Sequence, residues 1–193
     1  MAETLLWRSP LAQLGRDTFV LPGGAIELEE RARLGKFLLR GAPDDEAFLA
    51  AVKTASGLEL PREPNRSAAG GPLTALWTQP DEWLITCELG EQEKIGSALA
   101  AAGLTFTEVG EGRAALRLGG PRSIDLLRKG TSLNLHPRVF RPGDCAQTKL
   151  AQCGVLLHRP GEAAVYDIFC ERSFAEYLWL WLEDAALEFG AAG

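Results

Sequence analysis

Few residues of this chain have the chemistry of a catalytic or metal site, and their spacing does not assemble one. The two histidines are His136, which precedes a proline in a predicted loop, and His158, which ends a predicted strand. They lack the Glu-x-x-His spacing of a metal site, so a structural or surface role is favoured for each. Four acids have the chemistry of general bases: Asp81, Asp125, Asp144 and Asp167. The sequence does not pair any two of them, so it predicts no catalytic residue and no metal site.

Glycine-rich turns are the next candidates, because backbone N–H groups at such turns can hold phosphate. Segments 110–112 and 119–121 both contain glycines, but neither matches Gly-x-Gly-x-x-Gly. The second segment leads into a predicted helix N-terminus, which can hold an anion. Glycine and proline also satisfy ordinary turn rules there, so a tight strand-to-helix turn is the favoured interpretation.

Composition and charge narrow the classes of partner. The chain has 193 residues, 46% hydrophobic and 24% charged, with a net charge of −6. An acidic surface is repelled by phosphate backbones, which argues against nucleic acid. No basic segment followed by an apolar run begins the chain, and no apolar run reaches the ~20 residues of a membrane span. A cytoplasmic location is predicted, and in a cytosolic chain four cysteines without Cys-x-x-Cys spacing are expected to be free thiols: Cys87, Cys145, Cys153 and Cys170.

The elements that would position these residues predict an α+β fold. From residue 73 onward the pattern reads β-β-α-β-β-α-β-β-β-α, which indicates mainly antiparallel sheets with packed helices and split β-α-β units. Residues 1–60 are predicted as an irregular N-terminal arm, a β-hairpin of 25–29 with 36–40, and a helix. Residues 61–72, rich in proline and glycine, are predicted as a mobile linker loop. Residues 73–193 form the α+β body, although the whole chain is also compatible with one unit.

The last helix is apolar on more than one side. A stripe at 3.6-residue spacing is expected to face the core: Phe174, Tyr177, Leu178, Trp181, Leu182 and Ala185. Trp179, Leu180 and Leu187 lie outside that stripe. One interpretation is a helix packed on two sides within the chain, for instance against the N-terminal arm. The other, adopted here, is that these three residues are exposed and form a candidate partner interface.

Several segments, in order and spacing, resemble the gamma subunit family of heterotetrameric sarcosine oxidase. The resemblance covers roughly the last 115 residues, while the N-terminal third is only loosely similar. The segments that carry it are Gly112–Pro121, Leu127, Lys129-Gly130, Leu133-Asn134-Leu135-His136-Pro137, Ala146-Gln147-Thr148, Val155–Arg159 and Arg172–Trp179.

The resemblance implies a fold similar to the folate-binding domain of glycine-cleavage-type aminomethyltransferases. It implies a non-catalytic, structural subunit of an oxidoreductase complex with alpha, beta and delta partner subunits. That complex oxidatively demethylates sarcosine in sarcosine catabolism and passes the one-carbon unit to tetrahydrofolate. FAD, FMN and NAD are expected in the alpha and beta subunits and zinc in delta, with no cofactor in this chain. Lys129-Gly130-Thr131 lacks the cysteine of the Lys-Gly-Cys motif in related iron-sulfur-assembly proteins, so no catalytic residue is carried over.

Two alternatives remain at this point. The chain could be a folate-binding one-carbon protein that acts alone, or an interaction protein in another oxidase of N-methylated amines. Folate binding by the lone chain would distinguish the first alternative from a role inside a sarcosine oxidase.

Overall fold

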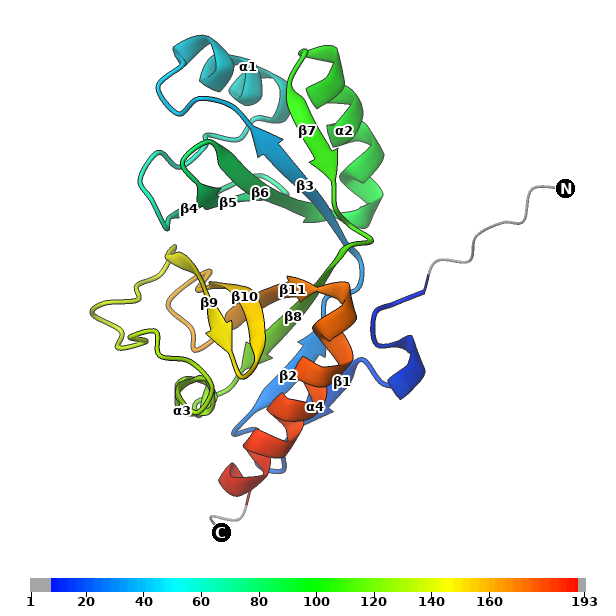
Figure 1. The fold of residues 1–193 in the computed structure, drawn as a ribbon, viewed down its shortest axis with the longest axis vertical. Helices are drawn as coiled ribbons and strands as arrows, with labels where there is room; N and C mark the ends of the chain where they lie inside the picture. Colours follow the sequence, from blue (N-terminus) through cyan, green and yellow to red (C-terminus); the bar gives the residue numbers. More distant parts are fainter. Residues whose placement is uncertain (1–7, 191–193) are drawn as a thin grey trace, which may run out of the picture.

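Two antiparallel sheets form the centre of the molecule in a computed structural model, which describes residues 8–190 (Figure 1). The six-stranded sheet has, in spatial order, β1 (Thr18–Val20), β2 (Glu27–Glu30), β8 (Arg113–Gly119), β11 (Tyr166–Glu171), β10 (Cys153–His158) and β9 (Cys145–Leu150). The five-stranded sheet has β4 (Ser67–Gly70), β5 (Leu73–Gln79), β6 (Glu82–Glu88), β3 (Leu34–Arg40) and β7 (Thr105–Glu108). Every strand pairing within them is antiparallel.

Helices cover the outer face of each sheet, so the layers run helix, sheet, sheet, helix (Figure 1). Helices α1 (Glu46–Ser56) and α2 (Gln92–Ala101) pack on the five-stranded sheet, and α3 (Ser123–Arg128) and α4 (Ala175–Ala186) on the six-stranded one. Four short 3-10 turns complete the description: η1 (Ala12–Leu14), η2 (Leu89–Glu91), η3 (Arg172–Phe174) and η4 (Leu187–Phe189). From β5 onward the order of strands and α-helices is the one that the sequence predicts, which confirms the α+β class.

Local sequence explains helix α1. The Asp45 carboxylate accepts hydrogen bonds from the N–H groups of Ala47 and Phe48, at 2.9 and 3.2 Å, and so caps the helix start. Gly57 ends it with a left-handed φ of 72°.

The two sheets meet through a thin apolar layer with polar groups around it. Its buried residues are Leu76, Leu84, Ala115, Cys145, Leu156 and Phe169. Larger apolar cores lie between each sheet and its helices. The sheets are also joined by backbone hydrogen bonds at one corner, where Ser67 N–H donates to Gly143 O at 2.7 Å and Cys145 N–H donates to Asn65 O at 2.9 Å.

Two expectations for the N-terminal part are wrong. Segments 25–29 and 36–40 do not form a hairpin: β2 pairs with β1 and β8, whereas β3 pairs with β6 and β7. Residues 61–72 are not only a linker, because they contain β4, which pairs with β5. Both sheets take strands from before and after residue 61, so the sheets do not follow the division into 1–60 and 73–193.

Candidate functional site

Helix α4 contains the residues predicted to meet a partner. Its buried arc faces the six-stranded sheet and the N-terminal segment that begins at residue 8. Leu11 belongs to the same buried cluster as Leu178 and Leu182. The Arg16 guanidinium pairs with the Glu183 carboxylate at 2.6 Å, which fastens that segment to the helix.

The expectation of exposure is wrong for Trp179 and right for its two companions. Trp179 is 0% exposed, because it packs in the core of the six-stranded sheet. On this side of the helix the first interpretation, packing on two sides within the chain, is therefore the correct one. Leu180 is 42% and Leu187 58% exposed. Phe174 and Tyr177, expected in the buried stripe, are exposed as well. The prediction therefore placed the buried arc of the helix about one residue away from its true position.

The exposed apolar side chains gather on one side of the last helix and its flanking turns. We call Phe174, Tyr177, Leu180 and Leu187 the α4 face. Glu176 and Asp184 lie on the same exposed arc, because positions three and four apart share a helix side. An apolar centre with a charged rim is the composition of a protein interface. The α4 face thus contains Leu180 and Leu187 of the predicted interface and adds Phe174 and Tyr177, which were expected to be buried.

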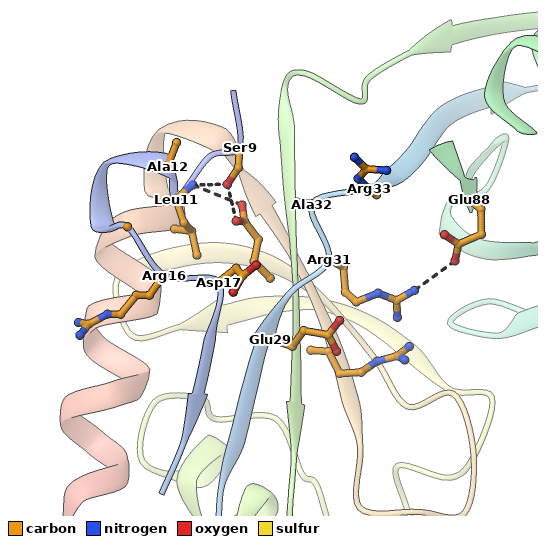
Figure 2. Close-up of a pocket in the computed structure, with 13 residues that line it drawn as sticks. Ser9, Leu11, Ala12, Arg16, Asp17, Glu29, Arg31, Ala32, Arg33 and Glu88 are labelled. Carbon is orange, nitrogen blue, oxygen red and sulfur yellow. Dashed lines mark hydrogen bonds and ion pairs between the residues drawn. The ribbon is translucent and has the colours of Figure 1, made fainter. Parts of the chain in front are cut away.

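A cavity of about 740 Å³ lies between the N-terminal segment and the start of β3 (Figure 2). Three of its four arginines have an ion-pair partner. Arg31 reaches Glu88 at 3.6 Å across the cavity wall, and Ser9 donates to the buried Glu30 carboxylate. Among residues 8–190, Arg33 is the cavity arginine without an ion-pair partner. Balanced charges of this kind give the cavity no strong preference for an anion or a cation.

A serine, a histidine and an aspartate meet between the two sheets, a grouping that the sequence analysis missed. Ser67 on β4 lies 2.9 Å from His158 Nε2, and His158 Nδ1 lies 3.6 Å from Asp167 on β11. The residues come from three strands, separated by 91 and 9 positions (158 − 67 and 167 − 158). No spacing rule would have connected them, and only His158 and Asp167 lie in segments whose sequence has strand character.

The hydrogen bonds argue against a nucleophilic serine. Ser67 Oγ lies 3.0 Å from Gly143 O, a separation that requires the hydroxyl proton between the two oxygens. His158 Nε2 must then donate its own proton to Ser67, whereas a general base would have to accept one. The arrangement is a structural tie between the sheets.

An ion pair between Arg117 and Asp167 completes this arrangement. Arg117 on β8 donates two hydrogen bonds to the Asp167 carboxylate, at 2.7 and 3.0 Å. Burial alone would raise the pKa of Asp167, but hydrogen bonds from His158 and Arg117 outweigh it and hold the pKa below its ordinary value. Asp167 is therefore ionised at neutral pH and holds the Arg117 guanidinium and the His158 ring in place.

The four cysteines are not activated. All lie in the described part of the chain, are buried and are free. Burial raises the pKa of Cys87 to about 11 and those of Cys145 and Cys170 to about 12, so the reactive thiolate is scarce at neutral pH. Across residues 8–190 no group of three or more His, Cys, Asp or Glu side chains is placed to hold a metal, and no helix has the length and apolar character needed to cross a bilayer.

The described part of the chain is therefore an α+β protein whose buried charges are held by ion pairs or hydrogen bonds, with no assembled nucleophile. Its fold is similar to that of glycine cleavage system aminomethyltransferase T from Bartonella henselae. The TM-score is 0.59 at 15% sequence identity, over 80% of this chain and 44% of that one. This likeness shows the aminomethyltransferase type of fold.

Closer similarity defines the family. A model of the sarcosine oxidase gamma subunit family matches residues 40–188. The sarcosine oxidase gamma subunit of Corynebacterium sp. (strain U-96) is 34% identical over 98% of this chain and 95% of its own, and that of Arthrobacter sp. is 33% identical over 98% and 94%. A chain of the heterotetrameric sarcosine oxidase of Corynebacterium sp. U-96 has a TM-score of 0.84 at 32% identity, over 97% of this chain and 98% of that one. The chain belongs to the sarcosine oxidase gamma subunit family.

Proposed function

We propose that this chain is a non-catalytic subunit of a sarcosine oxidase complex, where it supports assembly. The observation that carries the proposal is the match over nearly the full length of both chains to one chain of a heterotetrameric sarcosine oxidase, at a TM-score of 0.84. Family membership and the absence of an assembled nucleophile between residues 8 and 190 support a structural role. The α4 face supplies an apolar surface for a neighbour.

The partners in this proposal are alpha, beta and delta subunits. FAD, FMN and NAD belong to the alpha and beta subunits and zinc to delta, and the one-carbon unit passes to tetrahydrofolate on the complex. We place the complex in the cytoplasm. The four free, buried thiols support this location, because a reducing compartment keeps thiols unpaired.

Co-expression of the full chain with the three partner subunits tests the proposal. We expect one complex with flavin absorbance and sarcosine-dependent peroxide formation, whereas the chain purified alone is colourless and has no oxidase activity. Sarcosine oxidation by the lone chain would refute the non-catalytic role. Failure to co-purify with any of the three subunits would refute the assembly role.

The aminomethyltransferase fold also makes a stand-alone folate-binding protein worth testing. Fold similarity at 15% identity gives no binding residues. Calorimetric titration of the lone chain with tetrahydrofolate decides between the two functions. We expect no micromolar binding, and a stoichiometric micromolar isotherm would favour the alternative.

A further inference from the structure

The connection between α3 and β9 concentrates positive charge in an acidic protein. The chain has 26 Asp and Glu in 193 residues, yet none falls within 126–143. That stretch contains four basic side chains besides His136: Arg128, Lys129, Arg138 and Arg141. The start of the stretch packs against α4, where Lys129 Nζ donates to Ala185 O at 2.8 Å, and the loop that follows α3 lies at the edge of the molecule (Figure 1).

Most of this positive charge is neutralised within the chain. Arg128 lies 3.6 Å from Asp125, and Lys129 lies 3.2 Å from Glu188. Arg141 lies 3.9 Å from the carboxylate of Asp144. Arg138 is different, because within residues 8–190 it has no ion-pair partner. Its side chain is exposed, so the stretch has one cation without a carboxylate partner in the chain.

Arg138 sits in a turn that is already ordered. We call residues 136–139 the loop tip, and all four are exposed. His136 O accepts hydrogen bonds from the N–H groups of Val139, at 2.7 Å, and Phe140, at 3.0 Å. His136 Nδ1 accepts the Arg138 N–H at 3.2 Å. These bonds fix the backbone of the tip before any partner arrives.

Two buried side chains fasten the tip from either end. Leu135 and Phe140 both belong to the core of the six-stranded sheet, and the Phe140 ring stacks on Tyr166 with centroids 6.5 Å apart. Arg159 Nη1 donates to Phe140 O at 2.8 Å, from a side chain that is itself buried. A loop built in this way loses little conformational entropy on binding, which favours its use as a contact.

The exposed chemistry of the tip combines a cation with apolar surface. Arg138 stands between Pro137 and Val139, and Val139 is 55% exposed. Arginine beside apolar side chains is enriched in protein interfaces. Since the chain as a whole is acidic, this tip is one place where an acidic partner is attracted and not repelled.

We propose that the loop tip docks on an acidic surface of another protein chain in the complex, with Arg138 as its charged anchor. This inference rests on the proposed function, because it needs a partner subunit. The partner surface contributes at least one carboxylate to Arg138 and an apolar contact to Val139. The interaction is therefore sensitive to charge and to ionic strength.

Charge reversal in the assembled complex tests the docking. The full chain carrying Arg138→Glu is co-expressed with the alpha, beta and delta subunits, and dissociation on dilution is measured by mass photometry at low and high NaCl. We expect Arg138→Glu to raise the apparent Kd about tenfold or more at low salt. High salt should reduce the difference from wild type. Arg138→Lys keeps the charge and should stay within about threefold.

The matched control is Lys94→Glu, which changes the net charge equally on α2, where the Lys94 side chain is 76% exposed. It should leave the Kd unchanged, and all variants should melt like wild type. Equal affinity of wild type and Arg138→Glu, or equal weakening by Lys94→Glu, would overturn the inference while the assembly role stands. If the wild-type chain bound none of the three subunits, the proposed function and this inference would both fail.

Discussion

Replacing Asp167 with asparagine should loosen the tie between the two sheets. The Asp167 carboxylate is the shared partner of Arg117 and His158, and its side chain is 13% exposed. Removing one member of a buried ion pair costs ~3–5 kcal/mol, because the remaining charge is left without a partner. The Arg117 side chain is 36% exposed, so water solvates part of the orphaned cation. We therefore expect Asp167→Asn to lower the free energy of unfolding by about 2 kcal/mol at pH 7.

The pH dependence of that difference identifies its cause. The pKa of Asp167 in the folded protein lies below its ordinary value of 3.8. A depressed carboxyl pKa stabilises the fold above the unfolded-state pKa, and the stabilisation is lost as pH falls through the folded-state pKa. The gap between wild type and Asp167→Asn should therefore be full at about pH 5–7 and shrink below about pH 4.

Urea unfolding of both proteins across this pH range provides the measurement. Asp125→Asn is a suitable control, because Asp125 forms exposed ion pairs with Arg122 and Arg128. The replacement should change the free energy of unfolding by less than ~0.5 kcal/mol. Equal stability of wild type and Asp167→Asn at pH 7 would refute the reasoning. A gap that stayed constant down to pH 3 would show that packing, and not charge, causes the loss.

Four further predictions concern packing, assembly, backbone conformation and thiol chemistry. Trp179→Ala should lower the free energy of unfolding, measured by urea denaturation, by ~3–5 kcal/mol, because the ring is fully buried. Leu180→Asp should leave the melting temperature unchanged but reduce recovery of the complex in size-exclusion chromatography, because Leu180 is exposed. Gly120→Ala should lower the melting temperature, because φ is +103° and an added Cβ would lie 2.5 Å from Ala25 O. Cys145, with a pKa of about 12, should resist a thiol reagent at pH 8 in the folded protein and react after unfolding.

The order of elements after residue 73 could be predicted because its signals are local. Turn residues such as Pro80-Asp81 and helix ends such as Gly103 mark the boundaries within a few positions of the elements they separate. Partner choice in the N-terminal part is not local. Strand β2 pairs with β8, more than 80 positions later in the chain, so a hairpin with its sequence neighbour looked equally good.

Strand β4 escaped prediction for a different reason. Its sequence, Ser-Ala-Ala-Gly, shows no alternation of apolar and polar residues and follows a proline-rich segment. Its pairing depends on backbone groups, which every residue except proline supplies. The Ser67 N–H at the start of β4 and the O atom of the nearby Asn65 bond to the other sheet, so the segment is held from both sides by contacts that side-chain patterns do not report.

The sequence predicted that helix α4 is apolar on several sides, but not which of its residues are exposed. A helix that is apolar on several sides has more than one arrangement that buries enough surface, and adjacent residues differ by about 100° around its axis. Trp179 and Leu180 are such neighbours, and the first is buried in the core of the six-stranded sheet whereas the second is exposed. The position of the buried arc is also marked by Glu183, which lies in that arc and is neutralised there by Arg16. Since that pair joins positions 167 residues apart, it could be recognised only once the fold had brought them together.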